Sequence, residues 1–175
     1  MSNSPAIYIV EDDDMQRELL ADHIGKMSNY PIKSFPTGEE CLKHLSTSKD
    51  NPVIIYLDYY LNSIIPDAMD GLDVLVEIKK THPNCEVVML SGQDKIEVAV
   101  DTMKYGAFDY IVKGESAFYR AEKALFNIYR YHKLRKNASL YKTLTITFAV
   151  AFLLMIILFF VLQKSGAITN TPGWM

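Results

Sequence analysis

The chain has 175 residues, of which 49% are hydrophobic and 22% charged, and its formal net charge is −3. This length can bury one core but is short for two full domains. Residues 1–115 carry 20 acidic and 10 basic side chains, whereas residues 116–142 carry seven basic ones against Glu122 alone. An acidic body would repel phosphates, which argues against a nucleic acid partner for the basic cluster.

Residues 6–113 alternate short apolar runs with stretches of helical periodicity. The runs predict five strands: Ala6–Val10, Tyr30–Phe35, Val53–Leu57, Glu86–Leu90 and Phe108–Val112. Three of them are nearly continuous Ile, Val, Leu and Tyr, as expected of strands buried on both faces of a parallel sheet.

The first predicted helix follows the first strand and covers Asp14–Met27. Asp13 or Asp14 can cap its N-terminus, because short acidic side chains accept hydrogen bonds from the first turn. Its expected apolar face consists of Met15, Leu19, Leu20 and Ile24.

Later helices follow each remaining strand, with recognisable beginnings and ends. They are predicted over Thr37–Leu45, Leu72–Lys80 and Asp94–Tyr105, and a long helix starts at Ser116. Thr37 and Glu40 have capping-box spacing, Pro83 stops the third helix and Gly106 stops the fourth. The long helix carries an apolar stripe of Phe118, Ala121, Leu125 and Ile128. Five strand-then-helix units predict an α/β fold with a five-stranded, doubly wound parallel sheet.

A charge-free apolar run extends from Thr143 to Leu162. Twenty helical residues span about 30 Å, the thickness of a bilayer's hydrocarbon core. The alternative is a buried core helix, but a soluble helix of this length would normally show a polar stripe. The basic cluster before the run marks the cytoplasmic side. The N-terminal region has no basic stretch typical of a signal peptide, so we expect none.

This pattern predicts a single-pass protein of the cytoplasmic (inner) membrane. We expect a folded domain over residues 1–130, a basic juxtamembrane helical stalk over 131–142, a transmembrane helix over 143–163 and a short external tail over 164–175. Cys41 and Cys85 lack metal-site spacing and are expected to be reduced thiols.

Polar side chains follow four of the five predicted strands, where sites form in open parallel sheets. The strand ends carry Glu11-Asp12-Asp13, Asp58, Ser91-Gly92 and Lys113. Clustered carboxylates repel one another and need a cation, and hard oxygen ligands favour Mg²⁺. Ser91 could hydrogen-bond a phosphoryl oxygen and Lys113 could compensate its charge. The residue types therefore predict an aspartyl-phosphate site at Asp58.

Over residues 5–130 the sequence resembles response-regulator receiver domains of two-component signalling, which have a flavodoxin-like (βα)5 fold. The motifs that carry the resemblance are Ile9-Val10-Glu11-Asp12-Asp13, Tyr56-Leu57-Asp58, Met69-Asp70-Gly71-Leu72-Asp73-Val74-Leu75, Val88-Met89-Leu90-Ser91-Gly92 and Gly106-Ala107-Phe108-Asp109-Tyr110-Ile111-Val112-Lys113.

The resemblance assigns a role to each residue of the site. Asp58 would accept a phosphoryl group from a histidine kinase or histidine phosphotransfer protein. Glu11, Asp12, Asp58 and the backbone carbonyl of Tyr60 would hold Mg²⁺. Ser91 and Lys113 would be the switch hydroxyl and lysine, and the aromatic Tyr110 would report phosphorylation to the face formed by the fourth helix, fifth strand and fifth helix. That face could support a homodimer. The chain would assist its own phosphorylation and dephosphorylation without being an enzyme otherwise.

Two features depart from the family pattern. Gly71 lies thirteen positions after Asp58, instead of about eight as in the family, which predicts an insertion within residues 59–70. Gly114 follows Lys113 where the family usually has a cis proline. A cis bond before a residue other than proline costs about 2.5–4 kcal/mol, so the bond is either trans or the glycine takes an unusual conformation.

These features together predict a membrane-anchored response regulator that signals by protein–protein contact at the membrane. A degenerate receiver that serves only as a membrane-bound interaction module is one alternative. A haloacid-dehalogenase-like phosphohydrolase is another, although Tyr60 stands where that family has a general acid.

Overall fold

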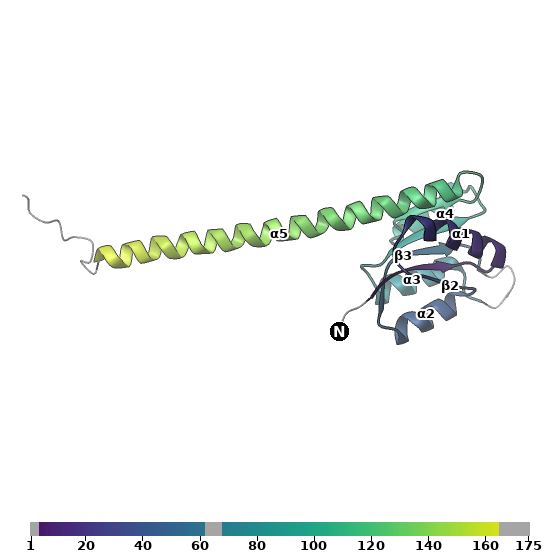
Figure 1. Cartoon of the computed structure of the whole chain (residues 1–175), viewed down its shortest axis with the longest axis horizontal. Coiled ribbons are helices and arrows are strands. Elements are labelled where there is room, and N and C mark those ends of the chain that lie inside the picture. The colour runs from purple at the N-terminus through teal and green to yellow at the C-terminus, as the bar shows by residue number, and fades with distance from the viewer. Residues whose placement is uncertain (1–3, 62–67, 165–175) are drawn as a thin grey trace, which may run out of the picture. The chain divides into compact units, whose positions relative to one another are not determined.

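The structure is a computed structural model that describes residues 4–61 and 68–164. It contains one five-stranded parallel sheet with helices on both faces (Figure 1). In chain order the elements are β1 (Ser4–Val10), α1 (Asp14–Met27), β2 (Ile32–Phe35), α2 (Gly38–Thr47), β3 (Asp50–Asp58), α3 (Gly71–Thr81), β4 (Glu86–Ser91), α4 (Ile96–Lys104), β5 (Asp109–Val112) and α5 (Ala117–Lys164). The strand order is β2-β1-β3-β4-β5, so the predicted α/β parallel fold is confirmed.

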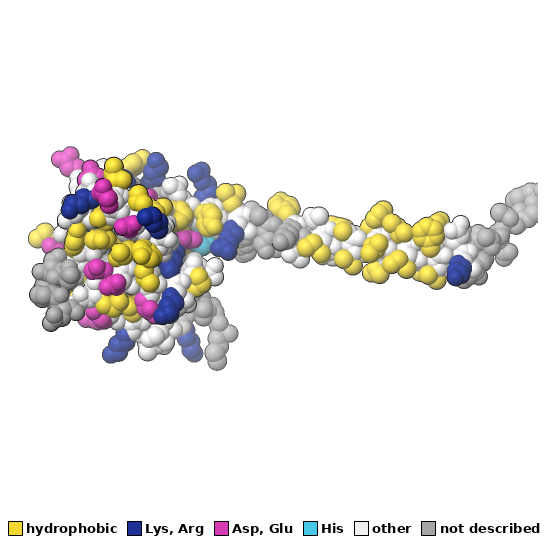
Figure 2. Space-filling model, turned by 180° about the vertical axis from the view of Figure 1, so that it is seen from behind, with side chains coloured by type: hydrophobic (Ala, Val, Ile, Leu, Met, Phe, Trp, Pro, Cys, Tyr) yellow, Lys and Arg dark blue, Asp and Glu magenta, His cyan; other side chains and the backbone are white. Residues whose placement is uncertain are grey.

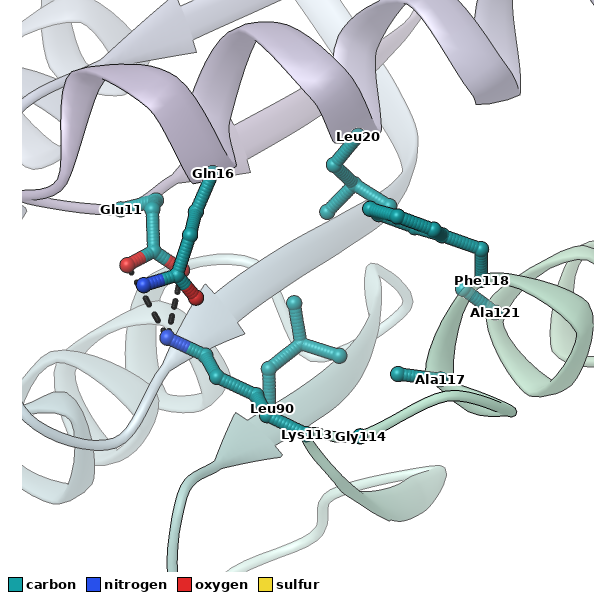
Figure 3. Close-up of a pocket in the computed structure, with 9 residues that line it drawn as sticks. All are labelled: Glu11, Gln16, Leu20, Leu90, Lys113, Gly114, Ala117, Phe118 and Ala121. Atoms are coloured by element: carbon teal, nitrogen blue, oxygen red, sulfur yellow. Dashed lines mark hydrogen bonds and ion pairs between the residues drawn. The ribbon is translucent and has the colours of Figure 1, made fainter.

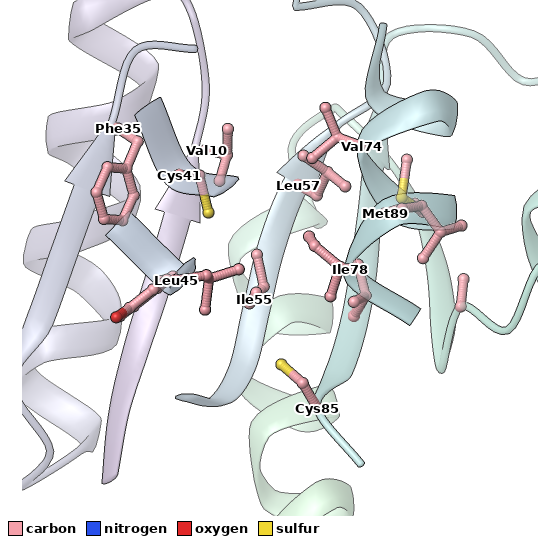
Figure 4. Close-up of a cluster of buried hydrophobic side chains, with 14 of the residues drawn as sticks. Val10, Phe35, Cys41, Leu45, Ile55, Leu57, Val74, Ile78, Cys85 and Met89 are labelled. Atoms are coloured by element: carbon pink, nitrogen blue, oxygen red, sulfur yellow. The ribbon is translucent and has the colours of Figure 1, made fainter. Parts of the chain in front are cut away.

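Alternate side chains of the strands enter two separate cores. In β1, Ile7 and Ile9 face α1 and α5, whereas Tyr8 and Val10 face α2, α3 and α4. Figure 4 shows part of the second core, where Ile55, Leu57 and Met89 meet side chains of α2 and α3. Burial on both faces explains why the strand sequences are almost uniformly apolar.

The longest strand, β3, begins three residues earlier than predicted. It includes Pro52, which pairs with Ala6, and the register shifts directly afterwards so that Ile7 pairs with Ile54. Proline cannot donate to a strand ladder and is tolerated at such irregularities. The apolar pattern marked only the regular part of the strand.

The apolar face of α1 differs from the prediction. Leu20 and Ile24 are buried, but Met15 is 71% exposed and Leu19 is 51% exposed. In α5, Ala121, Leu125 and Ile128 are buried as expected, whereas Phe118 is 39% exposed. Helical periodicity identifies a broad stripe, and the width of the sheet beneath decides how much of it is covered.

The helix ends follow capping chemistry at most positions. Asp13 caps α1 by accepting from the backbone N–H of Gln16, and Thr37 caps α2 in the same way from Glu40. Helix α4 begins at Ile96, later than predicted, after Lys95, which makes no side-chain cap. The free thiols of Cys41 and Cys85 are both buried.

The chain divides into two units between Tyr129 and Arg130. The second unit contains the apolar part of α5, Thr143–Lys164, a stretch of 22 residues with mean hydropathy 2.9 and no burial. Figure 2 shows hydrophobic side chains along this part of the helix. By length and composition it is a candidate membrane span. The external tail predicted for residues 164–175 lies outside the described residues from residue 165 onward.

Candidate functional site

Four strands end at the same edge of the sheet and bring the predicted polar residues together there. The register pairs Val10 with Leu57 and Asp58 with Leu90, which places Glu11 and Asp12 beside the end of β3. These two carboxylates and Asp58 are all buried, as is Ser91. Buried carboxylates require compensating charge or ligands, so this edge is chemically distinct from the rest of the core.

The three carboxylates form a compact group of oxygen ligands. One oxygen each from Glu11, Asp12 and Asp58 lies within 4.8 Å of the others. Among the described residues, Oδ1 of Asp58 is a buried oxygen that accepts no hydrogen bond. Hard oxygen donors without thiolate or imidazole fit Mg²⁺. The arrangement therefore fits the cation that the sequence predicts.

Lys113 provides the positive charge at the site. Its Nζ lies 2.7 Å from Oε2 of Glu11 and 3.0 Å from Oδ2 of Asp58. Its backbone N–H donates to the carbonyl of Ser91 over 2.7 Å, which fixes the end of β5 against the end of β4. The side chain of Lys113, which follows β5, thus links the end of β1 with the end of β3.

The pKa values of Glu11, Asp58 and Lys113 are all raised above their ordinary values. Burial raises the pKa of Glu11 to about 7, and the charge of Asp58 adds to the rise against the opposing effect of Lys113. Burial also raises the pKa of Asp58, while Lys113 lowers it. For Lys113, burial favours the neutral form, but Asp58 and Glu11 outweigh it and the pKa is raised. Burial therefore opposes the charged forms of both carboxyls, and a further cation would counter this effect.

A second set of contacts leads from the site to Tyr110. Oγ of Ser91 accepts a hydrogen bond from the backbone N–H of Gln93 over 3.1 Å. The hydroxyl of Tyr110 donates to the carbonyl of Gln93 over 2.7 Å, and its ring is buried against the sheet. Gln93, in the loop between β4 and α4, is therefore held by both the hydroxyl of Ser91 and the side chain of Tyr110.

The segment after β3 is held close to Asp58 on both sides of the predicted insertion. Tyr59 donates to the carbonyl of Leu90, and Gly71 donates to the carbonyl of Tyr59. A Cβ at Gly71 would lie 2.0 Å from the backbone oxygen of Asp58, so glycine permits this approach. Of the insertion predicted within residues 59–70, residues 62–67 lie outside the described part of the chain.

The Lys113–Gly114 bond, left open by the sequence, is trans. Gly114 has no positive φ, so the unusual conformation that glycine would allow is not adopted. The residue lines a pocket of ≈ 130 Å³ between α1 and the start of α5, next to Glu11 and Lys113 (Figure 3).

Two residues near the site were not predicted. Gln16 lines a pocket of ≈ 320 Å³ together with the carboxylates, Lys113 and Tyr60. Arg17 donates to the backbone carbonyl of Glu11 over 2.7 Å and so fixes the acidic turn. Both lie on the first turn of α1, where proximity to the Asp13 cap was the available signal.

Comparison with known proteins links this sequence and fold to one protein family. The family model described as the response regulator receiver domain matches residues 7–118. The chain is 36% identical over 107 residues to a putative NtrX-like response regulator of Rickettsia felis, covering 61% of this chain and 21% of that protein. The first relatives matched in this way are therefore about five times as long as the matched region.

Solved structures agree with this assignment. The receiver domain of NtrX from Brucella abortus is 32% identical with a TM-score of 0.57, covering 68% of this chain and 97% of that one. The signal receiver domain of a putative Luxo repressor protein from Vibrio parahaemolyticus is 25% identical with a TM-score of 0.64, covering 76% and 95%.

Proposed function

The chain belongs to the response regulator receiver family, and from this premise we propose that Asp58 accepts a phosphoryl group in a Mg²⁺-dependent reaction. The donor would be a histidine kinase or a histidine phosphotransfer protein, the usual partners of receivers. The observation that carries the proposal is the unpartnered, buried Oδ1 of Asp58 beside two further carboxylates and a lysine.

The cation would be held by Glu11, Asp12, Asp58 and the backbone carbonyl of Tyr60. Mg²⁺ bound there would neutralise the carboxylates and polarise the incoming phosphoryl group. The raised pKa values of Glu11 and Asp58 support this, because burial disfavours their charged forms and a bound cation would favour them. Asp13 lies at the rim as the cap of α1 and would remain outside the ligand set.

The chain's own residues would then stabilise the phosphorylated state. Lys113, already 3.0 Å from Asp58, would pair with a phosphoryl oxygen, and the hydroxyl of Ser91 would donate to another. Turning Ser91 toward the phosphoryl group would give up its contact with Gln93, which also holds the hydroxyl of Tyr110. This shared contact supports Tyr110 as the switch residue that biases a two-state equilibrium.

The exposed apolar residues beside the site support docking of the donor. Met15 and Leu19 of α1 are exposed, and the partly exposed Phe118 at the start of α5 lines the pocket that also contains Glu11 and Lys113. Exposed apolar residues next to a reactive group are typical of protein interaction sites. The donor would therefore contact α1 and the start of α5 while its phosphohistidine reaches Asp58.

The output would be protein–protein contact at the cytoplasmic face of the inner membrane. The apolar stretch within α5 supports a single-pass anchor over residues 143–163, preceded by a stalk over 131–142 and a receiver domain over 1–130. On α4, Ile96, Val100 and Met103 are exposed and offer a surface for a homodimer through the α4-β5-α5 face. Confinement to a membrane raises effective concentration and makes weak contacts of this kind productive.

The test is phosphorylation of the full chain by acetyl phosphate, followed by intact mass. We expect one phosphoryl group in the presence of Mg²⁺, none with a chelator and none in Asp58→Asn. The matched control, Asp94→Asn, removes an exposed carboxylate and should retain the modification. Phosphorylation of Asp58→Asn would refute the site. A chain that binds neither Mg²⁺ nor beryllofluoride would instead be a degenerate receiver that acts as an interaction module.

A further inference from the structure

The C-terminal part of the chain contains no acidic residue after Glu122. Between this point and the apolar stretch lie six basic residues: Lys123, Arg130, Lys133, Arg135, Lys136 and Lys142. Surface helices normally place acidic side chains three or four residues from basic ones, where they form ion pairs. Residues 123–142 of α5 contain no acidic residue that could form such pairs within this segment.

The segment Arg130–Lys142 is termed the basic segment. Arg130, Lys133 and Arg135 are exposed within it, and the described residues make no ion pair with them. Tyr131, Leu134 and Tyr141 alternate with the charges and are 47%, 63% and 70% exposed. Tyrosine is enriched at the level of lipid headgroups because one end is apolar and the other polar.

The distances along the helix fit a bilayer surface. At about 1.5 Å per residue, Arg135 lies about 12 Å and Arg130 about 20 Å before Thr143, where the apolar stretch begins. The headgroup layer is about 5–8 Å thick and charges act over about 8 Å beyond it at physiological ionic strength. Long basic side chains can also extend toward the headgroups. Lys133 and Arg135 thus fall within electrostatic range, and Arg130 at its limit.

We propose that the basic segment binds the headgroups of anionic phospholipids in the leaflet that faces the receiver domain. The inference rests on the proposed membrane anchor and adds a lipid preference to it. Complementary charge favours this partner, because each Lys or Arg at an anionic surface contributes a factor of about five in association. Residues 1–115, which carry a net negative charge, would be repelled by the same surface.

The experiment reconstitutes the full chain in phosphatidylcholine vesicles containing a trace of spin-labelled lipid. The fraction of immobilised label gives the association of phosphatidylglycerol relative to phosphatidylcholine. We expect at least a fivefold preference for phosphatidylglycerol that decreases at high salt. Lys133→Gln combined with Arg135→Gln should lower it at least threefold. Lys43→Gln combined with Lys49→Gln, two exposed lysines of the receiver domain, should not change it.

The outcomes separate the lipid preference from the anchor. Equal association of both lipids, in a chain that alkaline carbonate does not extract, would overturn the lipid preference and leave the anchor intact. Extraction by carbonate would overturn both. An unchanged preference in the Lys133 and Arg135 variant would also overturn the inference. Binding of an RNA oligonucleotide that this variant loses would assign the basic segment to nucleic acid instead.

Discussion

Replacing Glu11 by glutamine should stabilise the metal-free protein at neutral and alkaline pH. Glu11 is 2% exposed and shares the site with Asp58, whose charge disfavours ionisation of its carboxyl. Glutamine keeps the size of the side chain and an oxygen that can accept from Lys113, but it carries no charge. The substitution thus removes the repulsion while preserving the packing.

The magnitude follows from the pKa of Glu11. The pKa is about 7 in the folded chain against 4.5 for the free group. A carboxyl with a raised pKa keeps its proton longer in the folded state, so its contribution to stability is present below about pH 4.5 and is lost as the pH rises to about 7. At about 1.4 kcal/mol per pH unit, the free energy of unfolding falls by at most about 3 kcal/mol over this interval. The raised pKa of Asp58 acts in the same direction, and the two carboxyls titrate as a pair.

The assay is urea denaturation of the full chain in detergent micelles with a chelator, followed by near-ultraviolet circular dichroism between pH 5 and pH 8. The natural chain should lose stability across this range, and Glu11→Gln should reduce the loss. Glu115→Gln, which removes an exposed charge, should reproduce the natural profile. Mg²⁺ should offset part of this loss, adding about 1.4 kcal/mol at ten times its Kd. A metal-free chain whose stability is constant or rises between pH 5 and pH 7 would refute the reasoning.

Three further predictions concern the scaffold. Leu125→Ala, at a fully buried position, should lower the free energy of unfolding in urea by about 2–5 kcal/mol, whereas Phe126→Ala, at the exposed neighbouring position, should lower it by under about 1 kcal/mol. Equal losses would contradict the assigned core. Gly71→Ala should destabilise the fold by about 1–3 kcal/mol and impair phosphorylation, because the new Cβ would clash with the backbone of Asp58 and Tyr59. Gly92→Ala, whose Cβ would contact no other atom, should do neither. A tolerated alanine at Gly71 would contradict the close approach. The lysine and tyrosine partners of Asp50 lower its pKa to about 2, so the charged side chain should stabilise the fold above pH 4 and lose this effect toward pH 2. The difference in unfolding free energy between the natural chain and Asp50→Asn should therefore shrink with acidification. A constant difference would count against the ion pair.

The position of the site could be predicted from the sequence because local patterns and one topological rule suffice for it. Apolar runs that end in Glu11, Asp58 and Ser91 mark strand ends, and the ends of parallel strands share an edge. The charge-free run from Thr143 and the basic residues before it are equally local features. Their membrane role stays a prediction, since composition alone supports it.

Other features depend on packing that no local pattern encodes. Met15 and Leu19 have the spacing of a buried face, but the sheet beneath α1 covers only Leu20 and Ile24. The contact of Gly71 with the backbone of Asp58 joins residues on either side of the predicted insertion.

The sequence by itself determined which residues form the candidate site, because charge, apolar periodicity and strand ends can be read from the order of residues along the chain. Only the tertiary structure decided how these groups balance one another. Lys113 lies between Glu11 and Asp58, and one oxygen of Asp58 stays without a partner. The physical reason is that burial and charge interaction depend on distances between residues far apart in the chain, about which local patterns carry no information.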